Sequence, residues 1–336
     1  MDHPPMLTGA VTDGRAWRAE TLDAPPSWSC PLSPRCLSAL DQILADLRHN
    51  PRPMTEIRVR EDLRDACRED LRPALDALES GRGFVLIDRI PLERYTPEEA
   101  RTIYWVIGQM LGHPFEQDVK GALLYDVRDT GQRVTQGVRF SVTNAESSFH
   151  TDNAFGRVIP DYVGLLCLTT AKAGGLSQLI SAYALHNELL RQSPDTLETL
   201  YQPFHLDRRG EVRAGEGPTS QTPVFRWDGQ GLTTRYLHYY IQVGHEKAGE
   251  PLTPAQGEAL DALEGLLTRP DLRVEFAMQP GQMLFTNNRW ILHNRTAFED
   301  HPEPERQRHY IRLWLKRDPS PKRGYSCQTP HATTSS

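Results

Sequence analysis

Residues 147–155 read Ser-Ser-Phe-His-Thr-Asp-Asn-Ala-Phe, and their centre is the triplet His150-Thr151-Asp152. In an extended backbone successive side chains point to opposite faces, so the imidazole of His150 and the carboxylate of Asp152 would point the same way. Two histidines and one carboxylate, with three coordination positions left open, are the ligand set of non-heme Fe(II) oxygenases. The triplet therefore predicts two of the three protein ligands of an iron site.

Other triplets also combine a histidine and an acid at the same spacing, among them His186-Asn187-Glu188 and His301-Pro302-Glu303. His186-Asn187-Glu188 lies in a segment predicted to be helical, where residues two apart face different directions, so its side chains would not converge. His301-Pro302-Glu303 lies in a stretch rich in Pro and Glu, which indicates a solvated loop. Unlike these two triplets, His150 and Asp152 are framed by apolar, strand-like sequence that would hold both side chains rigidly.

The composition is that of an ordinary globular protein. The 336 residues are 38% hydrophobic and 24% charged, with a net charge of −6 and a pI of about 6.1. This balance argues against nucleic acid or an anionic membrane as a partner. No apolar run reaches the roughly 18 residues of a membrane-spanning helix, and the start of the chain does not resemble a signal peptide. We therefore expect a cytoplasmic protein.

The five cysteines are odd in number, scattered, and without Cys-x-x-Cys spacing. This pattern predicts neither a disulfide framework nor a zinc site, and reduced thiols are expected in the cytosol, where ferrous iron is available. The cysteines are Cys30, Cys36, Cys67, Cys167 and Cys327.

The first 80 residues are predicted to form an irregular arm followed by a helical support. Residues 1–33 are rich in Pro and small polar residues. Ser33-Pro34 then supplies an N-cap and a first-turn proline for a helix with leucines at helical spacing as far as Leu47. A second helix is predicted over residues 61–80, ending at Gly81.

Residues 81–318 are predicted to be one domain with a mainly β core. A strand is expected at Phe84–Ile87, followed by a helix that opens with the capping box Thr96-Pro97-Glu98-Glu99. Further helices are expected at residues 182–200 and after Thr253. The other expected strands lie near residues 122–127, 162–169, 176–181, 273–278, 282–285, 290–293 and 308–316.

Strands with intervening helices would also suit βαβ units. However, no Gly-rich phosphate loop follows any predicted strand, and the spacing of the elements is irregular. Many short strands with Gly/Pro turns fit an antiparallel jelly roll better. The prediction is an α+β fold, a jelly roll with N-terminal and flanking helices, and a flexible tail at residues 319–336.

A third metal ligand would come from a late strand, because a jelly roll brings distant strands together at one mouth. The candidate is His293, within residues 288–298. Taken alone, a histidine is more often a core or capping residue.

The last predicted strand has two different faces. Arginines on an inward face need anions, because an unpaired buried guanidinium is costly. A dicarboxylate cosubstrate would supply one, and structural ion pairs are the alternative. One face carries Arg308, Tyr310, Arg312 and Trp314, and the other carries His309, Ile311, Leu313 and Leu315.

Four motifs in this order resemble the taurine dioxygenase-like (TauD/TfdA) family of Fe(II)/2-oxoglutarate oxygenases, which includes clavaminate synthase-like and γ-butyrobetaine hydroxylase-like enzymes. The resemblance covers roughly residues 80–317. The motifs are Phe149-His150-Thr151-Asp152, Ala173-Gly174-Gly175-Leu176-Ser177, the segment from Asn288 to Thr296, and the segment from Arg308 to Trp314.

The resemblance implies a double-stranded β-helix that binds iron through His150, Asp152 and His293. It also implies that Arg308 pairs with the distal carboxylate of 2-oxoglutarate, helped by the hydroxyl of Ser177, where many relatives carry Thr. Arg312 occupies the position from which some relatives contact an acidic substrate group or steady the cosubstrate.

The implied activity is hydroxylation of an unactivated C–H bond of a small polar molecule, an amino acid, amine or carboxylate, with 2-oxoglutarate and O₂ as cosubstrates. Desaturation or cyclisation is an alternative outcome, and halogenation is not expected because Asp152 is present. Two other classes are a non-catalytic jelly-roll binding protein and a cupin-like iron enzyme that does not use the keto acid.

Substrate contacts are harder to predict. A lid over the pocket is expected at residues 206–244, although its aromatic run from Arg235 to Tyr240 would also suit an ordinary strand. A homo-oligomer is compatible with the sequence. The candidate substrate residues are Asn144, Glu146, Asn153, Phe155, Arg235, Tyr236 and Arg312.

Overall fold

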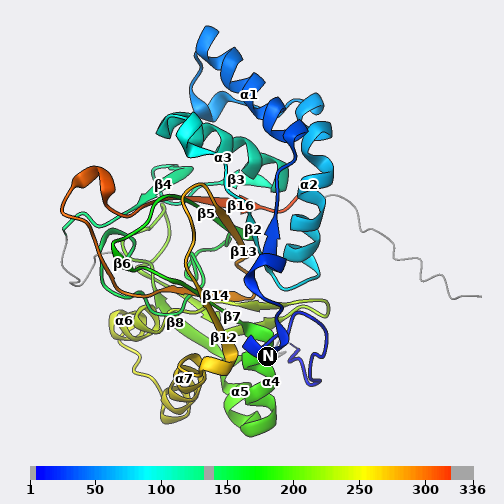
Figure 1. Cartoon of the computed structure of the whole chain (residues 1–336). Helices are drawn as coiled ribbons and strands as arrows, with labels where there is room; N and C mark the ends of the chain where they lie inside the picture. Colours follow the sequence, from blue (N-terminus) through cyan, green and yellow to red (C-terminus); the bar gives the residue numbers. More distant parts are fainter. Residues whose placement is uncertain (1–4, 132–139, 319–336) are drawn as a thin grey trace, which may run out of the picture.

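In a computed structural model of the chain, which describes residues 5–131 and 140–318, the largest sheet has seven strands (Figure 1). Their order is β1-β2-β13-β5-β16-β3, and β4 also pairs with β16. The pairing of β1 with β2 is parallel, and the other pairings are antiparallel. The strands are β1 (Ser29–Cys30), β2 (Phe84–Ile87), β3 (His113–Phe115), β4 (Leu124–Val127), β5 (Tyr162–Thr169), β13 (Met283–Asn287) and β16 (His309–Lys316).

A second, antiparallel sheet has three strands in the order β12-β7-β14, and it brings His293 opposite Leu179. Three two-stranded sheets complete the β structure, so the protein is a mixed α/β structure with a mainly sheet core. These strands are β12 (Arg273–Phe276), β7 (Ser177–Ser181) and β14 (Ile291–Arg295), and the pairs β6 (Ala173–Gly174) with β15 (Phe298–Glu299), β8 (Pro203–Asp207) with β9 (Thr219–Pro223), and β10 (Phe225–Trp227) with β11 (Leu232–Thr234).

Three helices, α1 (Pro34–His49), α2 (Glu61–Glu79) and α3 (Pro97–Leu111), share one buried cluster with the large sheet (Figure 1). The predicted caps are confirmed, because the hydroxyl of Ser33 accepts from the backbone N–H of Cys36, and Thr96 and Glu99 form the capping box. Ile311, Leu313 and Leu315 of β16 point into this cluster. Gly108 of α3 lies directly against Leu313, and a side chain there would overlap it.

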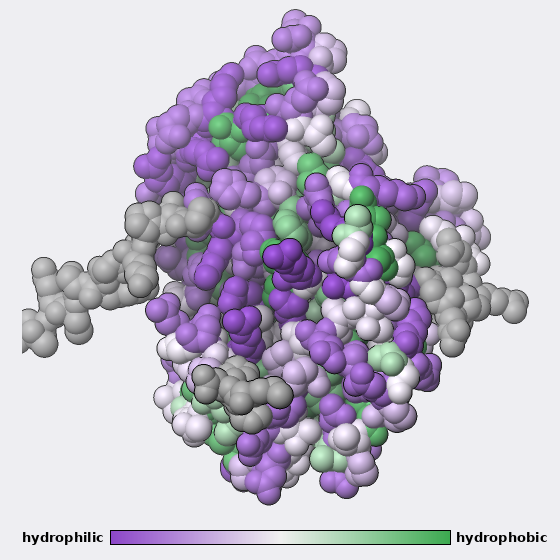
Figure 2. Space-filling model, turned by 180° about the vertical axis from the view of Figure 1, so that it is seen from behind, coloured by the Kyte–Doolittle hydropathy of each residue, from purple (hydrophilic) through white to green (hydrophobic). Residues whose placement is uncertain are grey.

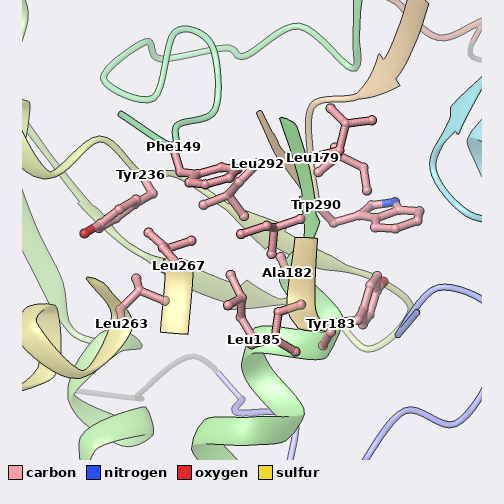
Figure 3. Packing of buried hydrophobic residues seen from close by; sticks show 14 of the residues in the cluster. Phe149, Leu179, Ala182, Tyr183, Leu185, Tyr236, Leu263, Leu267, Trp290 and Leu292 are labelled. Carbon is pink, nitrogen blue, oxygen red and sulfur yellow. The ribbon is translucent and has the colours of Figure 1, made fainter. Parts of the chain in front are cut away.

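Two of the other helices, α4 and α7, lie by the three-stranded sheet. Figure 3 shows Leu185 of α4 and Leu263 and Leu267 of α7 pointing toward Leu292 of β14. The prediction of one helix over 182–200 is wrong, because the chain breaks at Ser193, with φ of −156°, ahead of a proline. The helices are α4 (Ala182–Gln192), α5 (Pro194–Leu200), α6 (His238–Ala248) and α7 (Pro254–Leu267).

The aromatic run at residues 235–240 is not a strand, and α6 begins within it at His238. Gly244 allows this helix to pack directly on the backbone of β8, where a Cβ would collide with the carbonyl of His205. This close contact between helix and strand is not visible in the sequence pattern, which suggested only a lid or a strand.

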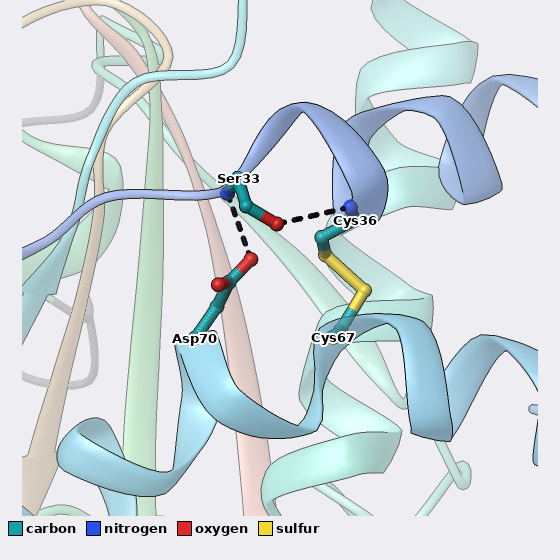
Figure 4. Close-up of a disulfide and its surroundings, with 4 residues drawn as sticks. All are labelled: Ser33, Cys36, Cys67 and Asp70. Atoms are coloured by element: carbon teal, nitrogen blue, oxygen red, sulfur yellow. Dashed lines mark hydrogen bonds between the residues drawn. A yellow bond between two sulfur atoms is a disulfide. The ribbon is translucent and has the colours of Figure 1, made fainter.

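The expectation that the cysteines are all reduced is wrong for two of them. Cys36 of α1 and Cys67 of α2 form a disulfide with a Cα–Cα distance of 4.6 Å, and both are fully buried (Figure 4). Beside it, the backbone N–H of Ser33 donates to Asp70 Oδ2 at 2.7 Å. The 31-residue separation gave no hint of the pairing, because it depends on how the two helices pack. Cys30 and Cys167 are free and buried, and Cys327 lies outside the described residues.

Hydrophilic side chains dominate the face shown in Figure 2. Across the described parts of the chain, the exposed large hydrophobic residues are Val119, Val158 and Val212. Within the same ranges, no helix is both long and apolar enough to cross a bilayer. The tail predicted to be flexible, residues 319–336, lies outside the described residues.

Candidate active site

Three side chains from distant parts of the chain converge as a metal-binding group. Ligand atoms of His150, Asp152 and His293 all lie within 4.8 Å of one another. One carboxylate oxygen, Asp152 Oδ1, is 3.4 Å from Nε2 of His150 and 3.7 Å from Nε2 of His293. Two imidazoles and one carboxylate are the donor set that suits Fe(II) in an oxygenase site, so the residues present fit that ion.

The two histidines are fixed to each other through the backbone. His150 and His293 form an isolated antiparallel bridge, with N–H···O distances of 3.1 and 3.0 Å. His150 Nδ1 lies 2.7 Å from the carbonyl oxygen of Ser148, which requires the proton on Nδ1 and leaves the Nε2 lone pair facing Asp152. The first ligand therefore sits on a short extended segment anchored to β14, and the extended backbone expected at His150 is confirmed only locally.

Asp152 is held on both sides. Its backbone N–H donates to the side-chain oxygen of Asn288 at 2.7 Å, and the amide of Asn288 donates back to the carbonyl oxygen of Asp152 at 3.0 Å. Its outer oxygen, Oδ2, accepts a hydrogen bond from Trp314 Nε1 at 2.6 Å and lies 3.2 Å from Nη1 of Arg312. Such outer partners orient a metal ligand and fix its charge state.

Electrostatics favour the protonation states of Asp152 and His293 that a metal requires. Burial works against the charge on Asp152, but Arg312 and the neighbouring His150 hold its pKa well below the ordinary value. Burial, together with the nearby His150, lowers the pKa of His293 to about 3. An ionised carboxylate beside neutral imidazoles is the arrangement in which these side chains bind a metal ion.

A buried cation lies in the same cavity. Arg308 is 3% exposed, and its Nε and Nη1 atoms have no hydrogen-bond partner among the described residues. The guanidinium stacks on Tyr310, 3.9 Å from the ring centroid, and burial lowers its pKa. Two unpartnered N–H groups on a buried guanidinium fit a carboxylate, so the distal carboxylate of 2-oxoglutarate suits this position.

The cavity has a volume of about 150 Å³ and joins the metal-binding group to Arg308. Its floor comes from the two sheets, and its outer wall comes from the turn after Asp152 and from the segment containing α6. The lining includes Ser177, Leu179, Val163, Leu165, Leu284, Arg312 and Trp314 on the sheet side, and Asn153, Phe155, Arg209, Leu237 and Tyr240 on the outer wall.

The sequence matches a known protein family. The model of the Taurine catabolism dioxygenase TauD, TfdA family matches residues 51–314. The chain belongs to the TauD/TfdA family.

Two curated relatives and one solved structure are similar over most of their lengths. FR-33289 synthase of Streptomyces rubellomurinus is 30% identical over 246 residues, covering 72% of this chain and 71% of the relative. Uridine-5'-phosphate dioxygenase of an Amycolatopsis species is 29% identical over 240 residues, covering 68% and 83%. The structure of asparagine oxygenase with Fe(II), 3-hydroxyasparagine and succinate has a TM-score of 0.65 at 20% identity, covering 86% of this chain and 93% of that one. This TauD/TfdA protein is a 2-oxoglutarate-dependent non-heme iron oxygenase.

The structure of this TauD/TfdA protein brings most of the predicted site residues into one cavity. In addition to the three candidate ligands, Ser177, Arg308, Arg312, Asn153 and Phe155 all line it. Arg312 contacts Asp152, and its Nε donates to Gln117 at 2.8 Å.

Four of the predicted substrate residues lie elsewhere. Asn144 and Glu146 are exposed: the carbonyl oxygen of Asn144 accepts from the N–H of Phe298 in β15, and the carboxylate of Glu146 accepts from Asn294 in β14. Arg235 donates to the carbonyl oxygen of Gly156, and the hydroxyl of Tyr236 bonds to Glu264. None of these four lines the cavity.

Several residues of the TauD/TfdA site were not predicted. The alternation of the last strand placed Trp314 on the correct face but did not reveal that it binds Asp152. Gln117 carries no pattern of its own, and Arg209 and Tyr240 lie in a segment without periodicity. Asn288 was visible only as part of a family motif.

Proposed function

We propose that His150, Asp152 and His293 bind Fe(II), and that Arg308 with Ser177 binds the distal carboxylate of 2-oxoglutarate. The product of the reaction is a hydroxylated small polar substrate. One observation carries the assignment: a metal-binding group and a buried arginine with two unpartnered N–H groups share one cavity. We also infer that residues 81–318 form a double-stranded β-helix, with residues 1–80 as its helical support and residues 206–244 as its outer cover.

Bound Fe(II), with 2-oxoglutarate and O₂, supplies the oxidation of an unactivated C–H bond, with release of succinate and CO₂. The protein's own residues position and protect this chemistry. Trp314 and Arg312 hold the outer oxygen of Asp152, so its other oxygen faces the two imidazoles. Apolar side chains of Val163, Leu165 and Leu284 line the cavity and limit the entry of water.

Two relatives support a small polar substrate. One is named for uridine-5'-phosphate, and the solved structure of another contains 3-hydroxyasparagine. The cavity of about 150 Å³ suits the reactive part of such a molecule. The buried Arg308, whose Nε and Nη1 atoms have no hydrogen-bond partner in the described part of the chain, favours a reaction that uses a keto acid over a cupin-like reaction that does not.

The test is anaerobic binding followed by turnover. Purified protein should bind one Fe(II) and one 2-oxoglutarate, and should release succinate slowly when O₂ is admitted. Asp152→Ala should lose iron binding, whereas Arg308→Ala should keep iron and lose 2-oxoglutarate. Arg82→Ala serves as a matched control, because Arg82 is a partly buried arginine that donates to the carbonyl oxygen of Phe84 and does not line the cavity. Wild-type protein that binds neither ligand would refute the proposal.

A further inference from the structure

Thr151, the residue between the first two metal ligands, has a set of hydrogen bonds of its own. It is 3% exposed and lines the cavity. Its backbone N–H donates to the carbonyl oxygen of Tyr236 at 3.0 Å, and its hydroxyl donates to the carbonyl oxygen of Thr234 at 3.2 Å. The same hydroxyl accepts a hydrogen bond from the backbone N–H of Tyr236 at 3.1 Å. Thr151 is therefore fastened to residues 234–236 by three hydrogen bonds, two of which need its hydroxyl.

The neighbours of Thr151 bond to a different part of the protein. His150 exchanges two backbone hydrogen bonds with His293 of β14. The backbone N–H of Asp152 donates to the side chain of Asn288, in the turn between β13 and β14. The short segment that carries both ligands is therefore held between β14 and its preceding turn on one side and residues 234–236 on the other.

Residues 234–236 lead directly into α6. The side chain of Tyr236 is fully buried, and only Leu237 separates Tyr236 from the first residue of the helix. The carbonyl oxygen of Leu237 accepts from the backbone N–H groups of Tyr240 and Ile241 at 3.0 and 3.2 Å. Leu237 also lines the cavity. The start of α6, in the outer wall of the cavity, is thus tied through Tyr236 to the backbone between two metal ligands.

This connection makes the order of the metal ligands and the order of α6 depend on each other. A metal ion held by His150 and Asp152 would fix both side chains, and with them the backbone at Thr151. A fixed Thr151 holds residues 234–236 in the position that the three hydrogen bonds require, so the start of α6 loses conformational freedom as well. When binding at one place orders another, the ordered state of the second favours binding at the first by the same factor.

We propose that Thr151 is a positioning residue that couples metal binding to the order of the outer wall of the cavity. Binding of the metal orders α6, and an ordered α6 strengthens metal binding. The inference rests on the proposed function, because it assumes that His150 and Asp152 bind the metal.

The test is hydrogen–deuterium exchange of the full chain, followed by mass spectrometry, with and without Mn(II). Mn(II) replaces Fe(II) because air does not oxidise it under these conditions, and its binding is first measured by calorimetry for every protein. In the wild type, we expect Mn(II) to slow amide exchange in the peptide that covers α6 about tenfold, a size typical of coupling between two sites.

Two substitutions isolate the contribution of the hydroxyl. Thr151→Val keeps the shape of the side chain but removes the hydroxyl, so the effect of Mn(II) on exchange in α6 should shrink by about threefold or more, and Mn(II) should bind more weakly by about the same factor. Thr151→Ser keeps the hydroxyl and should restore both. Thr102→Val is the matched control and should behave as the wild type, because the hydroxyl of Thr102 donates to the carbonyl oxygen of Glu98 in α3 and Thr102 does not line the cavity.

The ratio of exchange rates with and without Mn(II) separates coupling from stability, because a residue that only stabilised the fold would change both rates equally. The inference would be overturned if Mn(II) bound to the wild type without slowing exchange in α6, or if Thr151→Val kept the wild-type ratio. The first of these outcomes needs no variant, so it decides the matter even if Thr151→Val does not fold. Wild-type protein that does not bind Mn(II) would refute the proposed function, and this inference with it.

Discussion

Replacing Arg308 by Met should have opposite effects on cosubstrate binding and on stability. The substitution keeps a long side chain but removes a guanidinium that is 3% exposed and has two N–H groups without a partner among residues 5–131 and 140–318. In the proposed complex, the distal carboxylate of 2-oxoglutarate would then be buried without its cation. In the free protein, the variant would lose a desolvated guanidinium whose Nε and Nη1 atoms have no hydrogen-bond partner among the described residues.

The two effects differ in size. Removing one partner of a buried ion pair costs about 3–5 kcal/mol, so 2-oxoglutarate should bind a few hundred-fold to a few thousand-fold more weakly. In the free protein, burying an unsatisfied polar group costs about 1–3 kcal/mol, and the stacking on Tyr310 at 3.9 Å returns about 0.5–2 kcal/mol. Arg308→Met should therefore equal the wild type in free energy of unfolding or exceed it by about 1 kcal/mol.

Two assays on the same preparation separate these effects. Anaerobic calorimetry gives the Kd of 2-oxoglutarate for the metal-loaded protein, and urea unfolding without ligands gives the stability. Arg82→Met controls for the loss of a partly buried arginine outside the cavity and should leave the Kd unchanged. The reasoning would be refuted if Arg308→Met bound 2-oxoglutarate within about tenfold of wild type, or if the free variant lost more than about 1 kcal/mol.

Three further outcomes are expected. Trp314→Phe removes the N–H that donates to Asp152 Oδ2 at 2.6 Å and should weaken Fe(II) binding about 10–100-fold, as measured by competition with a chelator. An unchanged affinity for Fe(II) would mean that this hydrogen bond does not orient Asp152. Replacing Cys36 and Cys67 together by Ser should lower the free energy of unfolding by about 3–4 kcal/mol in urea, while 2-oxoglutarate binding stays at the wild-type level, because neither residue lines the cavity. Burial lowers the pKa of His186 to about 4 in the folded protein. Between pH 6.5 and pH 4 this histidine is protonated in the unfolded chain but stays neutral in the folded protein, so the free energy of unfolding should fall by about 3 kcal/mol over this range. His186→Phe should flatten that part of the stability profile, and an identical pH dependence in the variant would assign the loss to other groups.

Local signals in the sequence predicted the parts of the fold that depend on local chemistry. The Ser33 cap, the Thr96 capping box and the alternating faces of β16 all appear as expected. The disulfide between Cys36 and Cys67 and the packing of α6 on β8 depend on contacts between distant segments, which neither periodicity nor spacing reports. The pair Ser193-Pro194 marks the break between α4 and α5, but the helical pattern continues on both sides of it, so the sequence predicted one helix.

The active site also has residues that the sequence predicted and residues that it did not. His150, Asp152 and His293 were predicted because metal ligands have restricted types and spacing, and the structure brings them together. The residues that hold Asp152 in place have no such restriction, so Trp314 was placed only on a face. Asn144 and Glu146 were expected in the pocket because they are close in sequence to the metal motif. Instead, Asn144 bonds to Phe298 of β15 and the side chain of Glu146 bonds to Asn294 of β14.

The contact between Gly108 and Leu313 joins α3 to β16, the strand that carries two residues of the active site. One face of β16 presses on this helix, and the other carries Arg312 and Trp314 against the carboxylate ligand. A methyl group added at Gly108 would lie 2.3 Å from Cδ2 of Leu313, so this side chain of β16 would have to shift, and the same strand carries the two residues that hold Asp152. Random mutagenesis that selects for altered catalysis should therefore recover changes in α3, far from any atom that touches the substrate.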